Sequence, residues 1–421
     1  MSPRNLPELN IFLFDVDGVL VDPLAYKEGL KKSTEVLCIQ AGIQNWKELI
    51  PNDADVAFME SRGIHDVWDM TNIVFAQILS AAFKKYNSKI SNALSKTPAN
   101  LTDTQSLLHT LHALKIEIDR PDYHTFASKI TSDNSQRHPP DAALDLLLAS
   151  CSGRAVPCTA SNAPAKSTAP EAILLRAFLE FTRNVYKSYG TRIFQNIILG
   201  SADFESNYKL KSTYDGASLL KTIDRVLLSA SCLAKLNELQ KQDNCKMAVY
   251  TARPSQVPGD LPAAEGYSPE AEIAAEAAGL SHLPLVGMGM MEWLASRHNE
   301  RTEDLTKPNL THSLSALLAA VLQSNGSSTL ELAYSFERAK TSSELSPLAN
   351  KHINIFVFED TSSGIKPMQS LANELCQQSF SITVTALGIA NHPDKAKSLE
   401  GICHRVFLNI NDALEFVLKS I

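Results

Sequence analysis

Short apolar runs that end directly in acidic or hydroxyl residues constrain the fold of this chain most strongly. The clearest run covers residues 11–14, Ile-Phe-Leu-Phe, and Asp15-Val16-Asp17 follows it at once. A short, continuous apolar run of this kind is typical of a strand that is buried on both faces of a parallel sheet. The runs at residues 247–250 and 353–358 share this character and are followed by Thr251 and Glu359. Two further strands are expected at residues 382–386 and 405–408. The sequence therefore predicts five buried, parallel strands.

Helical patterns lie next to these strands, at residues 227–239, 313–322 and 413–419. Strands that alternate with helices predict a doubly wound α/β fold with a parallel sheet. In such sheets, ligands bind beside the carboxyl ends of the strands. We therefore expect the polar residues that follow the strands to meet at one edge of the sheet, although they lie hundreds of positions apart in the sequence.

Residues 25–235 have a different pattern, which is helical in period with few candidate strands. Helices are expected at residues 71–85, 142–148 and 172–186. We interpret the stretch as one helical domain inserted after the first strand. The α/β domain would then consist of residues 1–24 and 236–421.

Two irregular segments interrupt these domains. Residues 152–170 are rich in Ala, Ser, Pro and Thr, which predicts a loop or a flexible insertion. Residues 254–269 follow the second predicted strand and are expected to form an extended loop.

Charge and cysteine usage exclude several classes of function. The formal net charge of −7 argues against nucleic acid as a partner, but a small anionic substrate needs only a local positive pocket. The seven cysteines are scattered and form no CxxC pair, so we expect reduced thiols rather than disulfides or a zinc site. No leader pattern and no apolar run of membrane length is evident. We expect a cytoplasmic protein without a membrane partner.

The first strand end carries residues suited to phosphoester cleavage. Asp15 is expected to attack phosphorus as a nucleophile, because a carboxylate can form an aspartyl-phosphate. Asp17 would protonate the leaving oxygen and then deprotonate the water that hydrolyses the intermediate. Gly18 would let the backbone turn close to the phosphate without a clash from a Cβ atom.

The other strand ends supply groups that hold phosphate and metal. Thr251, with the backbone at Ala252, could bind phosphoryl oxygens. Glu359 and Asp360 are expected to face Asp15 and to form an oxygen site suited to Mg²⁺, which would screen the repulsion between nucleophile and substrate.

A lysine is needed to balance these acids and the charge of the transition state, and Lys307 is our choice. Lys366 is a rival, but it is expected to point away from the site on its helix. Each feature alone has an ordinary structural reading, as a turn, a helix cap or a solvated lysine. Their placement at successive strand ends favours the joint functional reading.

Four segments match the motifs of a known family. They are residues 14–22 (FDVDGVLVD), 250–254 (YTARP), 307–308 (Lys-Pro) and 358–365 (FEDTSSGI). The chain resembles the haloacid dehalogenase superfamily, and especially its β-phosphoglucomutase and phosphoglycolate phosphatase branch. The resemblance covers residues 9–24 and about 236–421. It implies a Rossmann-like core and a helical cap of the first type, although residues 25–235 are far longer than the usual cap.

The resemblance also implies roles for the residues that match the motifs. It implies a nucleophile, a general acid/base, a phosphate-binding hydroxyl and a motif lysine, which are Asp15, Asp17, Thr251 and Lys307. The metal-binding acids would be Glu359 and Asp360, which would hold Mg²⁺ with Asp15 and the backbone carbonyl of Asp17.

Residues 60–69 lie where caps of this kind often place residues that determine specificity. Arg62 or His65 could bind the distal group of the substrate. The alternative is that Trp68 packs in the core of the inserted domain and that the charged side chains are solvated.

These observations favour a magnesium-dependent phosphatase that hydrolyses a small phosphorylated metabolite through an aspartyl-phosphate. A phosphomutase of the same fold would share every core residue and remains an alternative. Dehalogenation is disfavoured, since the dehalogenase branch lacks an acid at the position of Asp17. A binding or regulatory protein that kept the fold without turnover is the alternative from a different class.

Overall fold

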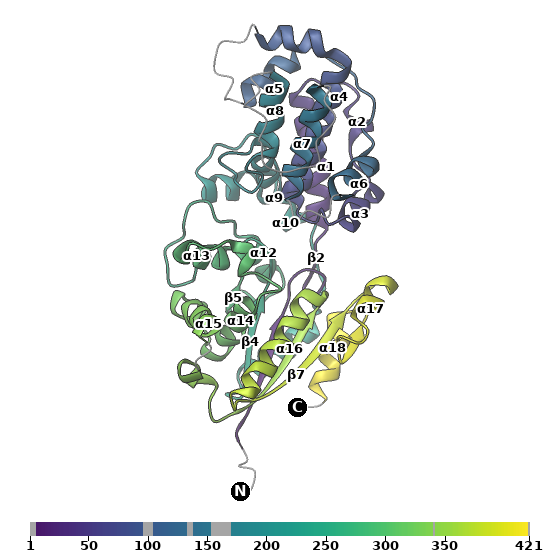
Figure 1. Ribbon diagram of the computed structural model, residues 1–421. Helices are drawn as coiled ribbons and strands as arrows, with labels where there is room; N and C mark the ends of the chain where they lie inside the picture. The colour runs from purple at the N-terminus through teal and green to yellow at the C-terminus, as the bar shows by residue number, and fades with distance from the viewer. Residues whose placement is uncertain (1–5, 96–103, 133–137, 153–169, 340–341, 420–421) are drawn as a thin grey trace. The chain divides into compact units, whose positions relative to one another are not determined.

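The five predicted apolar runs form strands of one parallel sheet. The computed structural model describes residues 6–95, 104–132, 138–152, 170–339 and 342–419. The sheet has six strands in the order β5-β4-β1-β6-β7-β8 (Figure 1). Their bounds are Glu8–Phe14 for β1, Cys245–Tyr250 for β4, Leu285–Val286 for β5, His352–Glu359 for β6, Ser381–Ile389 for β7 and Arg405–Phe407 for β8. The fold is therefore a Rossmann-like α/β fold, as predicted. The two-residue strand β5 was not predicted.

Aromatic side chains fix how the two central strands align. Phe12 pairs with Phe356 and Phe14 with Phe358 in the register of β1 and β6. The ring centroids of these pairs lie 5.2 and 5.0 Å apart, within the range of favourable aromatic contacts. A slip of one residue would turn each ring to the opposite face of the sheet. The packing of these rings thus determines which residues lie side by side where β1 and β6 end.

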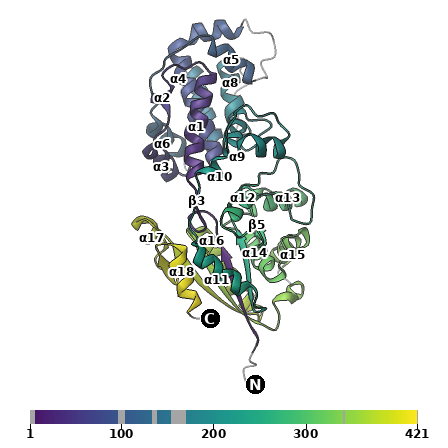
Figure 2. The ribbon, with the colours of Figure 1, turned by 180° about the vertical axis from the view of Figure 1, so that it is seen from behind.

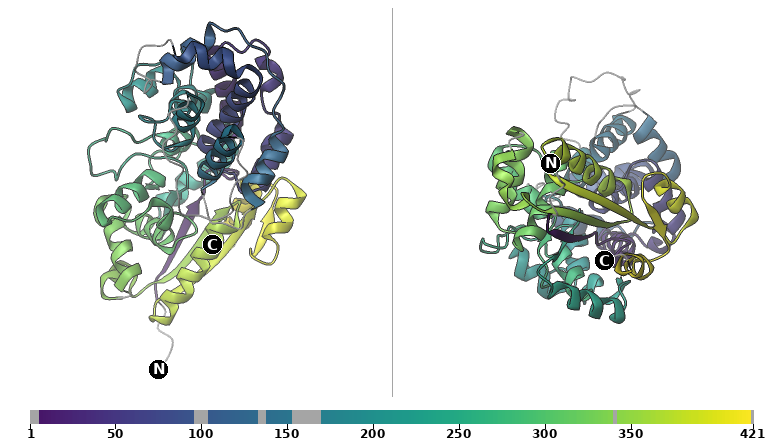
Figure 3. Two further views of the ribbon diagram at one scale, coloured as in Figure 1. Left: turned by 45° about the horizontal axis from the view of Figure 1, so that its top comes forward. Right: turned by 90° about the horizontal axis from the view of Figure 1, so that it is seen from below.

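Helices cover both faces of the sheet. Helices α14 (Leu310–Leu322) and α16 (Ser362–Gln377) pack on one face, and α11 (Ala230–Gln240) and α18 (Ile410–Leu418) pack on the other (Figures 1 and 2). Figure 3 shows the strands between these layers. Further elements of this part are α12 (Glu270–Ala277), α13 (Met288–His298), η1 (Thr302–Asp304), α15 (Ser327–Ala339), η2 (Ser342–Leu348) and α17 (Pro393–Leu399). Residues 254–269 contain no helix or strand, as predicted.

The chain divides into two compact units by its internal contacts. The sheet unit consists of Met1–Pro23 and Ile223–Ile421, and the helical unit of Leu24–Thr222. The sheet unit begins again at residue 223, earlier than the predicted 236. The reason is a short antiparallel pair between β2 (Val21–Asp22) and β3 (Arg225–Val226), followed by α11, which packs on the sheet.

The helical unit has its own apolar core. Its helices are α1 (Leu24–Gln40), α2 (Trp46–Leu49), α3 (Asp53–Ser61), α4 (Val67–Ser95), α5 (Thr104–His112), α6 (Tyr123–Ser132), α7 (Pro139–Ser152), α8 (Pro170–Leu179), α9 (Tyr189–Tyr208) and α10 (Leu219–Thr222). The predicted helices at 71–85 and 142–148 lie within α4 and α7.

One helix predicted in the helical unit ends early, and one predicted loop lies almost wholly outside the described residues. The helix predicted at 172–186 is wrong at its end, because α8 stops at Leu179 and Phe181 adopts a left-handed conformation with φ 62°. The predicted insertion at 152–170 lies almost wholly outside the described residues, which omit 153–169. Among the helices that the structure describes, none combines the length and the apolar character needed to cross a membrane.

Candidate active site

Three neighbouring strands deliver polar residues to one edge of the sheet. Asp15 follows β1, and its backbone N–H donates a hydrogen bond of 3.0 Å to the carbonyl of Phe358 on β6. Thr251 follows β4, and Glu359 is the last residue of β6. Because β4, β1 and β6 are adjacent, their carboxyl ends bring these residues together.

The acids at this edge form a compact group. Each of Asp15, Glu359 and Asp360 is buried, and each offers a carboxylate oxygen within 4.8 Å of the others. Across the part of the chain that the structure describes, this is the one such group of three potential metal ligands. Clustered carboxylate oxygens are the ligands that Mg²⁺ prefers. The predicted metal acids therefore do lie together.

Lys307 lies between two of these acids. Its Nζ atom is 3.0 Å from Oδ1 of Asp15 and 2.5 Å from Oε1 of Glu359, and its side chain is 5% exposed. It also lies 3.7 Å from the centroid of the Tyr250 ring. Lys366, in contrast, is exposed on α16. The structure thus brings Lys307, and not its rival, to Asp15.

The charges of the cluster are unbalanced. Burial and the nearby Glu359 carboxylate raise the pKa of Asp15 well above its usual range, against the effect of Lys307. Burial also raises the pKa of Asp360 to about 6, although Lys395 opposes the shift. Burial lowers the pKa of Lys307, but the charges of Asp15 and Glu359 outweigh burial and raise it. Three acids share two lysines, so a divalent cation would supply positive charge that the cluster lacks.

Glu359 also holds the start of α16. Its Oε2 atom accepts hydrogen bonds from the backbone N–H groups of Asp360 and Thr361, at 3.2 and 3.3 Å. A Cβ atom at Gly364 would lie 1.6 Å from Oε1 of Glu359, so this position requires glycine. Glu359 therefore fixes the turn between β6 and α16, whereas the N-cap residue of α16 is Thr361, whose side chain makes no capping hydrogen bond.

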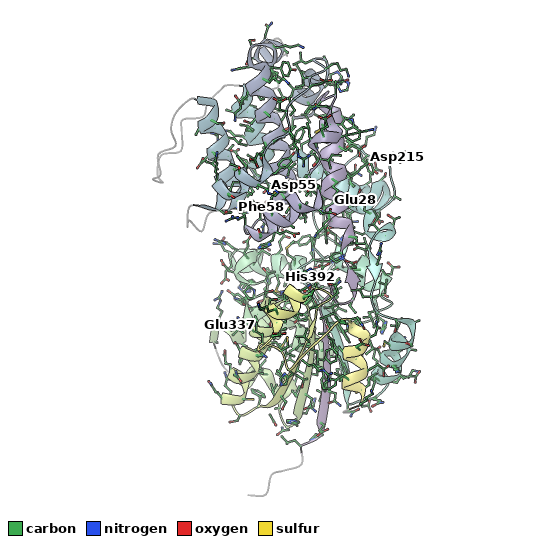
Figure 4. The ribbon with its side chains drawn as sticks, turned by 90° about the vertical axis from the view of Figure 1, so that its right-hand side faces the viewer. Glu28, Asp55, Phe58, Asp215, Glu337 and His392 are labelled. Carbon is green, nitrogen blue, oxygen red and sulfur yellow. The ribbon has the colours of Figure 1, made fainter. Side chains whose placement is uncertain are left out.

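Gly18 lies beside the acidic cluster, next to the carboxylate of Asp360. Its φ of 71° is left-handed, and a Cβ atom here would lie 2.3 Å from Oδ2 of Asp360. The same Asp360 oxygen accepts a hydrogen bond from Nζ of Lys395. Lys395 lies on α17, which follows His392 (Figure 4). Sequence reasoning missed Lys395, because it stands outside every motif.

Asp17 has partners that sequence reasoning also missed. Arg253 donates to Asp17 Oδ1 from both Nε and Nη2, at 2.9 and 2.6 Å, and donates from Nη2 to Asp224 at 3.0 Å. Arg253 stands within the segment 250–254 that resembles a family motif, and that was the available signal. Asp224 carries no comparable signal.

Thr251 and Ala252, which are predicted to bind phosphate, follow directly after β4. Thr251 is buried, and its hydroxyl accepts a hydrogen bond of 3.1 Å from the backbone N–H of Arg253. Ala252 is exposed at the same strand end. Both residues therefore lie at the end of β4, the strand next to the one that Asp15 follows, and their binding of phosphate stays a prediction.

Arg62 and His65 belong to the helical unit, and both are exposed. The Arg62 guanidinium lies over the ring of Phe58 on α3, 5.1 Å from its centroid. The exposure of Arg62 is in line with the alternative that the charged side chains of this segment are solvated. A role of Arg62 or His65 in substrate binding stays a prediction.

The comparisons with known proteins extend the description of the fold. No family model and no curated protein matches this chain. Among solved structures, an X-ray structure described as a target of the Northeast Structural Genomics Consortium is similar, with 16% identity and a TM-score of 0.65. The likeness covers 97% of this chain and 98% of that chain. At this identity, it shows a shared fold and carries no statement about activity.

Proposed function

We propose that the protein is a magnesium-dependent phosphatase of the haloacid dehalogenase type, which hydrolyses a small phosphorylated metabolite through an aspartyl-phosphate on Asp15. One observation carries this proposal. Asp15 lies at the end of a central strand with a lysine on one oxygen and two further acids beside it. The helical unit would then be an enlarged cap.

The proposed chemistry has two steps. An oxygen of Asp15 attacks phosphorus while the bond to the leaving oxygen breaks, and Asp17 gives that oxygen a proton. Asp17 then takes a proton from water, which attacks the aspartyl-phosphate, so that phosphate leaves and Asp15 is restored. Lys307 stabilises the negative charge that gathers on the phosphoryl oxygens.

Asp15, Glu359 and Asp360 would hold Mg²⁺ with the backbone carbonyl of Asp17. The bound cation would screen the repulsion between the Asp15 carboxylate and the anionic substrate. The surplus of acids over lysines and the raised pKa values of Asp15 and Asp360 support this assignment.

Hydrolysis of p-nitrophenyl phosphate by the purified protein tests the proposal. We expect turnover in the presence of Mg²⁺, its loss when a chelator removes the metal, and its return when Mg²⁺ is added in excess. A protein that releases no phosphate from p-nitrophenyl phosphate or from a panel of phosphorylated metabolites, with or without Mg²⁺, would favour the binding-protein alternative.

Lys395 should compete with the metal, because it donates to an oxygen of Asp360. Its side chain is 35% exposed, and a partly exposed ion pair is worth up to about 1 kcal/mol, or about fivefold in affinity. A Lys395→Met variant should therefore bind Mg²⁺ about two- to fivefold more tightly in isothermal titration calorimetry. Lys397→Met is the matched control, since Lys397 is exposed on the same helix. Equal or weaker binding by Lys395→Met would rule out competition.

A further inference from the structure

Arg253 holds two acids with one guanidinium group. Its Nε and Nη2 atoms donate to both oxygens of Asp17 at 2.6 to 3.1 Å, and Nη2 also donates to Asp224 at 3.0 Å. The side chains of Arg253 and Asp224 are 2% and 6% exposed, whereas that of Asp17 is 34% exposed. We call Arg253, Asp17 and Asp224 the Arg253 clamp. Within it, Asp224 is buried, whereas Asp17 is partly exposed.

The clamp is anchored at both ends. The backbone carbonyl of Arg253 accepts a hydrogen bond of 2.9 Å from the N–H of Met288, and this contact fixes the turn after β4. Asp224 directly precedes β3, which pairs with β2 in the antiparallel register Asp22 to Arg225. The clamp therefore ties Asp17 to the strand pair at which the chain leaves and re-enters the sheet unit.

The turn that bears Asp17 belongs to the same hydrogen-bonded segment. The N–H of Gly18 donates to the carbonyl of Val21 on β2 at 2.8 Å, and the N–H of Leu227 donates to the carbonyl of Leu20 at 2.8 Å. A displacement of β3 would therefore reach Asp17 by two routes, through the backbone and through Arg253.

The chemistry of the two partners limits what Arg253 can do. An arginine is always charged and carries only donors, so it cannot itself act as an acid or a base. Its planar fork holds a carboxylate in one orientation. The fork engages both oxygens of Asp17, and Nη2 also donates to Asp224, so Asp224 holds the guanidinium from a second side.

Building on the proposed function, we propose that Arg253 is a positioning residue that orients Asp17 for proton transfer, and that Asp224 holds Arg253 in place while Asp17 acts. The side chain of Arg253 donates to Asp17 and to Asp224. Loss of Arg253 should therefore slow the two proton transfers that Asp17 performs, to the leaving oxygen and from water, and single-turnover release of the leaving group isolates the first of them.

Two esters that differ only in the leaving group separate these effects. The p-nitrophenolate of p-nitrophenyl phosphate leaves without a proton, whereas the alkoxide of glycerol phosphate needs one. General acid catalysis contributes about 10²–10⁴-fold, so Arg253→Met should lose about 100-fold in the single-turnover rate at which glycerol is released from glycerol phosphate. The single-turnover release of p-nitrophenolate should fall less than about fivefold, because this step needs no proton, and the KM of both esters should not rise. Single turnover is needed because hydrolysis of the aspartyl-phosphate, in which Asp17 acts as a base, is common to both esters.

Two milder variants and one control complete the test. Arg253→Lys keeps the charge without the fork, and Asp224→Asn keeps the shape without the charge, so both should change the ratio of the two rates in the same direction by less. Arg297→Met is the control, since Arg297 is an exposed arginine of the same unit that pairs with Glu331, and it should keep the ratio of the wild type.

Each other outcome decides against the inference. Equal losses in the single-turnover release of the two leaving groups in all three variants would show a purely structural role, and a higher KM on both would show that Arg253 binds the phosphate. In either case a wild type that hydrolyses both esters leaves the proposed function standing. If the wild type hydrolyses neither ester with Mg²⁺, the phosphatase proposal fails and this inference falls with it.

Discussion

An Asp15→Asn variant should lose at least about 10⁴-fold in kcat toward any phosphate ester that the wild type hydrolyses, because an amide cannot replace the carboxylate nucleophile. Steady-state release of inorganic phosphate measures this loss. Asp243→Asn is the matched control, since Asp243 is an exposed acid of the same unit and should keep full activity. Activity within tenfold of the wild type in Asp15→Asn would remove Asp15 from the nucleophile role.

The same substitution should stabilise the metal-free protein at neutral pH. The pKa of Asp15 is raised in the folded state above its usual 3.8, so folding favours its protonated form. The stability that comes from this proton is present at low pH and is lost as pH rises above the unfolded value and through the folded one. The side chain of an asparagine does not titrate in this pH range, so this contribution to the pH dependence is absent from the variant. Thermal unfolding in the presence of a chelator should therefore show a flatter loss of Tm with rising pH in Asp15→Asn than in the wild type.

Replacement of Lys307 by methionine should cost both stability and activity. The change leaves Asp15 and Glu359 buried without the cation that lies within 3.0 Å of each. Breaking a buried ion pair typically costs about 3–5 kcal/mol in the free energy of unfolding, and loss of a transition-state cation about 10²–10³-fold in kcat. Urea unfolding of the metal-free protein and phosphate release measure the two effects.

The destabilisation caused by Lys307→Met should be smaller at about pH 5 than at about pH 8. Asp360 has a pKa of about 6, and the pKa of Asp15 is also raised. Both acids can therefore take up protons at about pH 5, which leaves less unpaired negative charge in the buried cluster. Lys366→Met is the control, because Lys366 is an exposed lysine near the same strand ends. A Lys307→Met variant as stable as Lys366→Met at both pH values would contradict the account of the cluster.

Much of the fold could be predicted from the sequence, because buried parallel strands leave a local signal. The apolar runs at 11–14 and 353–358 lie within β1 and β6, and their phenylalanine rings align the two strands. The two-residue strands left no such signal. The meeting of the strand-end acids with each other was predictable as well, since it follows from the order of parallel strands rather than from side-chain detail.

Two residues of the site, Lys395 and Asp224, could not be predicted, because their contacts depend on side-chain direction across long stretches of chain. Lys395 lies 35 positions after Asp360, and Asp224 lies 29 positions before Arg253. Local periodicity says nothing about either pair. The choice between Lys307 and Lys366 was similarly uncertain in sequence, and the burial of Lys307 against Asp15 decides it.

The central claim is that a phosphoryl group passes through the carboxylate of Asp15. Rapid quenching of turnover with borohydride, followed by mass spectrometry of the peptide that spans residues 5–27, tests it most directly, because borohydride reduces an acyl phosphate to an alcohol. The account predicts that Asp15, and no other residue of that peptide, is converted to homoserine in the presence of substrate and Mg²⁺. Turnover with Asp15 left unmodified, or with the reduction at Asp17, would contradict it.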